Sequence, residues 1–545
     1  MIQKLIDNKN TVLLFVIILL VIIPIMTVMS FIFQPSTELW GHLSDNLLID
    51  YLLNTGMIVI CVALLTLVIG VSCAWLVTNF TFPGINIFKW LLVMPIAIPT
   101  YVSAYIYAGL FEPSGMIFDS VENYMGLGKE LYDAIELRNI YGVIFILSIC
   151  LYPYVYLLAY SSFKEQSYCA IEVGKSLGLS DKELFSRVSI PLARPGIIAG
   201  VSLVVMETLA EFGTMDYYGV RTFTTGIYRT WFAFGDETSA LHLASILLTF
   251  VFIIIIVEKF SRGKSQYVNT SQKSKKIKAR YLNGIYGVYA CLWCLLFTLL
   301  GFILPVIQLL FWLSETYSYI FEEYYIQVIK NTVSIATISS IIIVLISIYS
   351  SYINRSTDNL YIKSSLKIFT LGYSIPGVVI AVGIIIPLAM VDSFQARIFG
   401  SPLYYLSGSF FALVLCYLVR FSTISYNATE SGLGKIKKNI DLTVHSFGLS
   451  DFAILKKVHM PIMKTTLITS FILVFVDIVK ELPATLILRP FNFDTLAINI
   501  YELASSEQLS YIASPSLILI IISLIPVILL IRKNINFGEK NEIRN

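Results

Sequence analysis

Four acidic residues stand inside otherwise apolar stretches of this 545-residue chain, and they come as two pairs. Glu207 and Glu211 form the first pair, and Asp477 and Glu481 form the second, 270 residues later. An acid at the centre of a membrane helix costs about 3 kcal/mol, so it is a functional candidate by default. On one helix, the i, i+4 spacing places both acids of a pair on the same face. Because carboxylate oxygens suit hard cations, we predict that these four residues line a cation pathway and bind a metal ion transiently.

A structural interpretation of the same acids stays open. Lys480 or Arg489 is close enough in sequence to neutralise them, and acids also cap the ends of broken helices. Against this, about 18 Å of helix would precede Glu207, which places it near the middle of a bilayer. Asp216 and Tyr217 continue the first pair outward and are included in the predicted pathway. The occurrence of the same pair twice favours a pathway.

The elements that hold these acids are predicted to be membrane-spanning helices. The chain is 57% hydrophobic and 13% charged, whereas soluble proteins are about half apolar and a quarter charged. A span needs about 20 apolar residues, and twelve segments qualify: 11–33, 53–79, 86–110, 141–162, 195–216, 240–258, 283–313, 331–353, 366–391, 405–427, 464–487 and 511–532. We therefore predict an all-α integral membrane protein. The net charge of only +3 gives no indication of a nucleic-acid partner.

The placement of charge predicts the orientation in the membrane. Lys and Arg accumulate on the cytoplasmic side, and the segment 261–280 is basic, rich in Ser, Gln and Asn, and free of acids. The loops 34–50 and 111–140 are acidic, so we expect them outside. We predict two cytoplasmic termini and a cytoplasmic linker, 261–280, between the halves 1–260 and 281–545. An acidic outer face suits a cationic cargo or a basic docking partner, unless acids are simply tolerated there.

The two halves repeat each other in the same order. The repeated motifs are Asn54-Thr55 and Asn331-Thr332, Pro99 and Pro376, Gly178 to Asp181 and Gly448 to Asp451, and Pro191 and Pro461. Each half has an even number of predicted spans, so the repeats are parallel and related by an axis along the membrane normal. Such an axis leaves a pathway lined by equivalent helices, and the matched acids are expected to meet there.

The most specific repeated motif lies in one cytoplasmic loop of each half, 164–195 and 428–464. In each copy a glycine is expected to stop a short helix, a serine two residues later to cap a second helix, and a proline to end it. Such a helix–turn–helix projects from the membrane and can serve as a docking element for another protein, although an ordinary interfacial helix would show a similar pattern. The predicted docking residues are Glu172, Gly178, Leu179 and Ser180 in the first loop and Asp441, Gly448, Leu449 and Ser450 in the second.

These loops resemble the EAA loops of bacterial ABC importer permeases. The resemblance implies that they dock into grooves on two copies of an ATP-hydrolysing subunit, which holds the ATP and Mg. The first copy keeps the acid, Glu172, and the glycine, Gly178. The second copy has Leu442 at the position of the acid and Asp441 one residue earlier. This departure raises the question whether the two loops hold their ATPase subunits equally.

The chain is predicted to be a permease and not an enzyme. Gly-Lys-Ser occurs at 174–176 and at 263–265, but a P-loop needs another glycine five residues earlier. Those positions hold Cys169 and Glu258. We therefore expect no cofactor on this chain and ATP hydrolysis on a partner subunit.

Further motifs are similar to those of ferric-iron importer permeases and extend the resemblance over nearly the whole chain. They are the runs 95–105, 207–214, 219–229, 480–485 and 488–497. The resemblance implies a fused twelve-helix permease of the type I importer fold in a bacterial cytoplasmic (inner) membrane. It also implies an extracytoplasmic iron-binding protein outside and two ATPase subunits inside.

The cargo stays open at this point. Related permeases carry phosphonates, thiamine or polyamines, and ferrous iron or another metal is an alternative. An ion-coupled secondary transporter would need no partner, and a membrane scaffold would show no uptake at all.

Overall fold

The computed structural model describes most of the chain. The described residues are 9–35, 37–112, 115, 121–124, 126, 137–164, 173–174, 176–262, 280–357, 359–402, 404–448 and 451–524. Of the predicted docking residues, Glu172, Leu449 and Ser450 lie outside them.

Helices make up nearly all of the described structure. The first half contains α2 (Lys9–Ser30), α3 (Glu38–Asn46), α4 (Leu48–Asn79), α5 (Ile85–Leu91), α6 (Thr100–Phe111), α9 (Ile140–Lys164), α11 (Asp181–Leu184), α12 (Ile190–Ala210), α13 (Gly213–Tyr217), α14 (Phe223–Phe232) and α15 (Glu237–Arg262). The second half contains α16 (Ile285–Thr298), α17 (Leu304–Thr316), α18 (Glu323–Ser356), α19 (Leu360–Leu366), α20 (Gly377–Phe399), α21 (Phe410–Gly434), α22 (Lys438–Ser446), α23 (Asp451–Ile454), α24 (Met460–Ile462), α25 (Lys464–Lys480), α26 (Pro483–Leu488) and α27 (Leu496–Ser505). Two short strands, β1 (Phe80–Thr81) and β2 (Arg280–Tyr281), pair in parallel.

The prediction of an all-α, multi-pass membrane protein is confirmed, but not the count of twelve spans. The described residues contain nine helices long and apolar enough to cross a membrane, or eleven if each of two bent helix pairs is one span. The last predicted span, 511–532, overlaps the shorter apolar helix Leu509–Leu524, where the described residues end.

Prolines break two of the predicted spans. The pair Ile85–Ala97 and Thr100–Phe111 is bent by 92°, and Pro99 lies in the break with an extended ψ of 146°. In the second half, Pro376 has a ψ of 140° and directly precedes α20. The predicted span 366–391 therefore begins as a continuous helix only at residue 377. Proline also disfavours a helical conformation in the residue before it, which explains why both breaks occur at equivalent positions.

The proline of the first predicted docking loop does not end a helix, contrary to the prediction, whereas the proline of the second loop lies just before a break. Phe185–Ser189 forms a π-helical turn just before Pro191, and the chain stays helical from α11 through α12. Leu455–His459 forms the equivalent π turn before Pro461, but there the helix ends at Ile462, and α25 begins at Lys464 after a bend of 75°. A wider turn accommodates a residue that lacks a backbone N–H and whose ring crowds the preceding turn. The loop helix is therefore continuous with the membrane helix that carries Glu207.

The two halves exchange their first helices. Helix α2 packs against α20 and α21 of the second half, and α16 packs against α4 and α5 of the first. Glycine permits the close approach: a Cβ on Gly383 would lie 2.6 Å from the carbonyl oxygen of Pro24, and one on Gly301 would lie 2.8 Å from that of Ile149. A rigid movement of either half therefore carries one helix of the other half with it.

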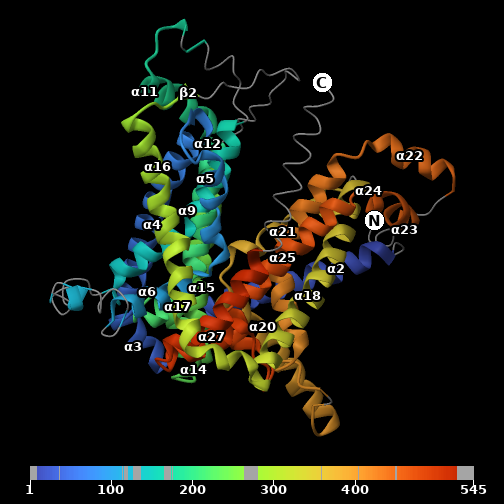
Figure 1. Ribbon diagram of the computed structural model, residues 1–545. Coiled ribbons are helices and arrows are strands. Elements are labelled where there is room, and N and C mark those ends of the chain that lie inside the picture. The colour runs from blue at the N-terminus through green and yellow to red at the C-terminus, as the bar shows by residue number, and fades with distance from the viewer. Residues whose placement is uncertain are drawn as a thin grey trace.

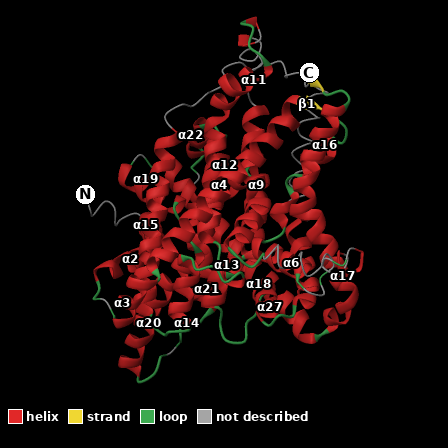
Figure 2. Ribbon diagram, turned by 90° about the vertical axis from the view of Figure 1, so that its left-hand side faces the viewer, coloured by secondary structure: helices red, strands yellow, loops and turns green. Residues whose placement is uncertain are grey.

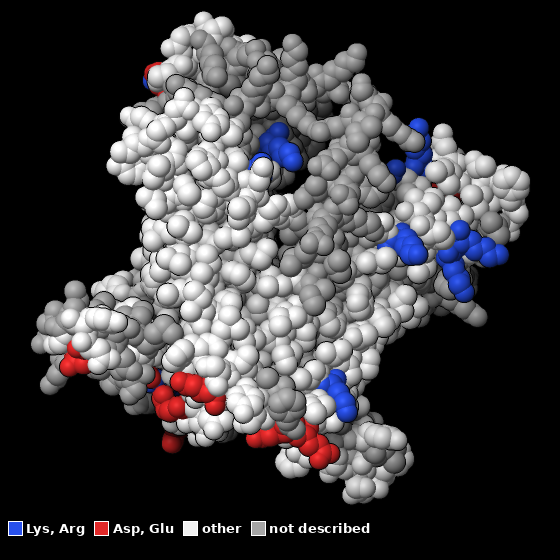
Figure 3. All heavy atoms as spheres, in the orientation of Figure 1, with Lys and Arg blue, Asp and Glu red and all other residues white. Residues whose placement is uncertain are grey.

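The helices form two arms that meet at one end and diverge at the other (Figure 1). We call the meeting end, which carries α14 and α27, the closed end, and the diverging end the open end. Figure 2 shows α11 and α22, from the two predicted docking loops, both at the open end. On the face drawn in Figure 3, most of the Lys and Arg lie toward the open end and most of the Asp and Glu gather at the closed end.

Candidate functional site

A cavity of about 120 Å³ lies between the two halves, where the broken helices meet. All four predicted acids line it: Glu207, Glu211, Asp477 and Glu481. The first half contributes the start of α6, the middle of α9 and the end of α12, and the second half contributes α21 and the end of α25. The structure therefore brings the matched pairs together, as the repeat predicted.

The two acids of a pair do not share a helix face, contrary to the prediction. Helix α12 ends at Ala210, and Glu211 has an extended ψ of 133°. Helix α25 ends at Lys480, and Glu481 has a ψ of 115°. Both predicted spans, 195–216 and 464–487, therefore end earlier than their hydropathy indicated. The i, i+4 rule holds only within a continuous helix.

Glu211 and Glu481 instead bind the backbone of the short helix that follows each break. The N–H of Thr214 donates to Glu211 Oε1 at 2.9 Å, and the N–H of Ala484 donates to Glu481 Oε1 at 2.9 Å. Carboxylates are favourable at a helix N-terminus because the first N–H groups there have no partner within the helix. The alternative that acids cap broken helices is therefore correct for the second member of each pair.

The remaining partners of these capping acids differ between the halves. Thr100 donates its hydroxyl hydrogen to Glu211, whereas the equivalent position of the second half is Gly377. A Cβ on Gly377 would lie 2.1 Å from Nη1 of Arg420, and this nitrogen donates to Glu481 at 3.4 Å. The absence of a side chain at Gly377 leaves room for the guanidinium of Arg420. In the first half the hydroxyl of Thr100 takes the place of this guanidinium. Glu211 is thus bound by a hydroxyl in the first half, whereas Glu481 is bound by a cation in the second half.

Glu207 and Asp477, the first members of the pairs, lie within their helices and face the partner half. The hydroxyl of Tyr373, from the second half, donates to Glu207 Oε1 at 2.5 Å. Lys480 interacts electrostatically with Asp477 and Glu207, and its Nζ donates to the carbonyl oxygen of Ile96 at 2.7 Å. Arg489 binds Asp494 and Glu502, so Lys480 is the one of the two suggested counter-ions that reaches the cavity.

The described residues contain no group of three or more His, Cys, Asp or Glu side chains arranged to hold a metal ion. In this conformation, the four carboxylates are therefore separate groups with different partners and do not form one coordination shell. A role for them as metal ligands stays a prediction.

Asp216 and Tyr217 lie on α13 and do not line the cavity, because the helix that was expected to carry them has ended. Asp216 accepts a hydrogen bond from Arg229 at 3.2 Å and one from Tyr501, in the second half, at 2.8 Å. Both residues belong to a layer of contacts between the cavity and the closed end.

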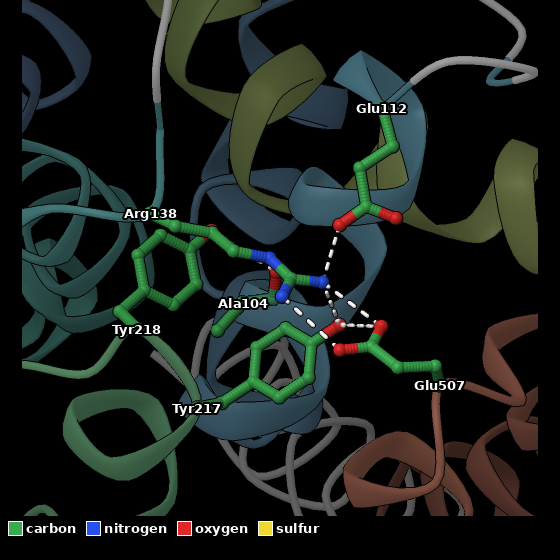
Figure 4. A network of polar contacts seen from close by, with 6 residues as sticks. All are labelled: Ala104, Glu112, Arg138, Tyr217, Tyr218 and Glu507. Atoms are coloured by element: carbon green, nitrogen blue, oxygen red, sulfur yellow. Dashed lines mark hydrogen bonds and ion pairs between the residues drawn. The ribbon is translucent and has the colours of Figure 1, made fainter.

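Tyr217 is part of a network that we call the clasp: Glu112, Arg138, Tyr217 and Glu507 (Figure 4). Arg138 donates to Glu112, to the hydroxyl of Tyr217 at 2.7 Å, and to both carboxylate oxygens of Glu507, at 3.0 and 3.1 Å. Its guanidinium carbon lies 4.6 Å from the centre of the Tyr217 ring. Burial alone would lower the pKa of Arg138, but these partners raise it above its usual value.

The clasp joins the two halves, because Glu507 belongs to the second half and both of its partners, Arg138 and Tyr217, belong to the first. Arg138 and Glu507 are 369 residues apart, and no motif in the sequence pairs them. Arg420 was also missed, although a lone arginine in the apolar run 410–421 is a functional candidate by the same rule that selected the acids.

The first predicted docking loop has the expected glycine stop and serine cap. Gly178 has φ +79°, a conformation that favours glycine. Ser180 and Glu183 form a capping box: the N–H of Ser180 donates to Glu183 at 3.1 Å, and the N–H of Glu183 donates to Ser180 Oγ at 3.4 Å. The hydrogen bonds from the backbone and side chain of Ser180 lower the pKa of Glu183. Gly178 is exposed and Leu179 is half-buried.

The second loop has the same glycine turn but holds its acid differently. Gly448 is exposed and has φ +77°. Asp441 accepts a hydrogen bond from Nε of Arg355 at 2.8 Å, and its other oxygen lies 2.7 Å from Nε2 of His459. Arg355 also donates to two backbone carbonyls, those of Leu433 and Ile436. Asp441 therefore ties the loop to α18 and to the π turn before the next membrane helix.

Comparison with known proteins gives matches over both halves. Residues 66–263 match the model of the binding-protein-dependent transport system inner membrane component. The chain is 25% identical over 538 residues to the Fe(3+)-transport system permease protein FbpB 2 of Haemophilus influenzae, which covers 94% of this chain and 96% of that protein.

Two further relatives match less of the chain. The ferric transport system permease protein FbpB of Actinobacillus pleuropneumoniae is 23% identical over 472 residues, covering 83% of this chain and 66% of that protein. The sulfate transport system permease protein CysT of Salmonella typhimurium is 27% identical over 150 residues, covering 28% of this chain and 51% of that protein. The chain is thus similar over nearly its whole length to an Fe(3+)-transport permease, and its residues 66–263 match the family model of the inner membrane components of binding-protein-dependent transport systems.

Proposed function

We propose that this chain is the membrane-spanning permease of an ATP-driven importer, and that its cargo is ferric iron delivered by an extracytoplasmic binding protein. The observation that carries the proposal is the similarity to the Haemophilus influenzae Fe(3+)-transport permease, which extends through both halves and both cytoplasmic loops. The cavity supports it, because four acids from the two halves line the space between them. Sulfate relatives match only part of one half's length, so they support the transporter class more than the cargo.

The proposed arrangement places the open end in the cytoplasm. Most of the Lys and Arg lie toward the open end on the face drawn in Figure 3, as expected for cytoplasmic segments. Both termini and the linker 261–280 are then cytoplasmic, and the halves are 1–260 and 281–545. The diverging arms correspond to a state in which the cavity is closed toward the outside and the two loops are apart.

Two copies of a partner ATPase dock on the two loops in this proposal. The first loop presents the exposed turn at Gly178, and the second presents the exposed turn at Gly448. ATP binding draws the loops together, and each loop moves its half because it is joined to a membrane helix. In the first half the loop helix runs without a break into α12, which carries Glu207. Closure at the loops would thus act directly on the cavity.

The energy source is tested in proteoliposomes that contain this chain, its ATPase subunits and its binding protein. We expect uptake of radioactive ferric iron that needs ATP inside, is inhibited by vanadate, and is lost when the ATPase subunits are omitted. Ferrous iron, sulfate and a polyamine are offered in parallel. Uptake by the chain alone, driven by an ion gradient, would show that it is a secondary transporter. ATP-driven uptake of sulfate in place of iron would overturn the proposal that the cargo is ferric iron.

A further inference from the structure

The four carboxylates of the cavity are matched between the halves, but its two cations, Arg420 and Lys480, both come from the second half. Lys480 is the last residue of α25, and the equivalent position at the end of α12 is Ala210. Glu207 and Asp477 occupy equivalent positions in the same two helices. Two matched carboxylates therefore interact with an ammonium that has no counterpart in the first half.

The other charged groups of the cavity have partners of their own. Arg420 donates to Glu481 at 3.4 Å. The two carboxylate oxygens of Glu211 accept hydrogen bonds from the hydroxyl of Thr100 and from the backbone N–H of Thr214. Lys480 is therefore the cation of the cavity that forms no described ion pair, and it interacts electrostatically with Glu207 and Asp477. Arg420, which is paired with Glu481, also acts on these two acids through its charge. Among the described ion pairs, none joins Nζ of Lys480 to Glu207 or Asp477 within 4.0 Å. Lys480 therefore acts on these carboxylates through its charge and not through a fixed ion pair.

The position of Lys480 depends on how the two halves lie against each other. Its Nζ donates to the carbonyl oxygen of Ile96 at 2.7 Å, and its own carbonyl oxygen accepts a hydrogen bond from Tyr101 at 3.5 Å. Ile96 and Tyr101 both belong to the first half and flank its helix break at Pro99. If the halves rock apart, Lys480 loses the contacts that hold its ammonium beside the carboxylates.

We propose that Lys480 is a tethered cation that occupies the place of the cargo between Glu207 and Asp477 and excludes other cations while the outside is closed. The proposal rests on the proposed function and names the residue that sets its selectivity. An ammonium on a four-carbon stem provides one positive charge and three hydrogen-bond donors. When the halves separate, the two carboxylates lose this charge in a site of low dielectric, which is costly unless a cation replaces it. A hard cation of higher charge displaces an ammonium most readily.

The test measures binding of terbium(III), a hard trivalent probe, to the purified full-length chain. Tyr373 donates a hydrogen bond to Glu207, so its ring is placed to sensitise the luminescence of terbium bound there. We expect Lys480→Met to increase terbium affinity at least about tenfold, because an opposing charge is removed from the site. Lys480→Arg keeps the charge and should leave the affinity low. Lys464→Met, at the exposed start of the same helix, is the matched control and should change nothing.

A second substitution assigns the signal to the cavity. Adding Asp477→Asn to Lys480→Met should abolish the gain, whereas terbium bound to acids elsewhere would be unaffected. If Lys480→Met lowers the amount of folded protein, Lys480→Gln serves as the second variant, with gel filtration as the check. An unchanged or weaker affinity in folded variants would overturn the proposal. Because this measurement needs no ATPase, no iron and no transport, its outcome is independent of the uptake experiment that tests the proposed function.

Discussion

The clasp is expected to hold the outer gate shut, and removing Glu507 should open it. In the clasp Glu507 receives two hydrogen bonds of 3.0 and 3.1 Å from Arg138 across the two halves, and a longer one of 3.5 Å from the hydroxyl of Tyr217. The side chains are 36% and 60% exposed, so water screens the pair. Exposed ion pairs are worth about 0.2–1 kcal/mol, and a two-bond geometry favours the upper end of that range. Glu507→Gln should therefore ease opening by about 1 kcal/mol, which is roughly a fivefold change in the equilibrium.

The opening is measured as the distance between spin labels on the two halves at the closed end. Phe232 and Phe491 are suitable label sites because they are 50% and 99% exposed and lie in different halves. In Glu507→Gln the population with a long distance should increase roughly fivefold without ATP. Arg138→Met should give a similar increase, and the double variant should add little to either single change, as expected for two residues that act through one contact.

A matched control breaks an ion pair that does not cross between the halves. Arg221 and Asp50 both belong to the first half, lie 3.2 Å apart, and are 54% and 49% exposed. Asp50→Asn should leave the distance distribution unchanged. If Asp50→Asn opened the gate as much as Glu507→Gln does, or if Glu507→Gln had no effect, the idea that the clasp is a gate would be refuted.

Three further substitutions test how the cavity and the loops are built. Asp441→Asn weakens the bond to Arg355 by about 1.5–3 kcal/mol and should uncouple ATPase activity from the binding protein; a fully coupled complex would contradict this. Gly377→Ala places a Cβ 2.1 Å from Nη1 of Arg420 and should lower the melting temperature, since overpacking costs about 1–3 kcal/mol; an unchanged melting temperature would show that the guanidinium has room to move. Ser180→Ala removes a helix cap worth about 1 kcal/mol and should speed amide exchange in the first loop, whereas unaltered exchange would argue against the cap.

The sequence predicted the membrane class, the parallel repeat and the convergence of the four acids. These features depend on local patterns: apolar length, recurring motifs and the positions of acids within apolar runs. The glycine turns followed in the same way, because Gly178 and Gly448 adopt conformations that glycine favours. The similarity to binding-protein-dependent permeases is also visible in short motifs.

The breaks after Ala210 and Lys480 could not be read from hydropathy. The residues that follow, such as Phe212 and Leu482, are as apolar as those before them. Each helix ends where a carboxylate binds the N-terminus of the next helix. The backbone there either continues the helix or bonds to this carboxylate, and the hydropathy of the segment is the same in both cases.

Long-range partners were beyond the sequence for a different reason. Tyr373 meets Glu207 across 166 residues, and Arg138 meets Glu507 across 369. Such pairs form only after both halves have packed together, and neither partner carries a spacing that identifies the other. Arg420 is the exception, since its position in an apolar run marks it as a candidate even without a known partner.

The most direct test of the central claim is iron uptake by the complete importer with Glu207→Gln and Asp477→Asn combined. Both substitutions keep the size of the side chain and remove its charge, and both residues line the cavity between the halves. We predict that the variant assembles with its ATPase subunits and keeps their basal ATP hydrolysis, while ATP-driven uptake of ferric iron falls at least tenfold. Uptake at the rate of the unaltered protein would contradict the claim that the matched acids form the path of the cargo.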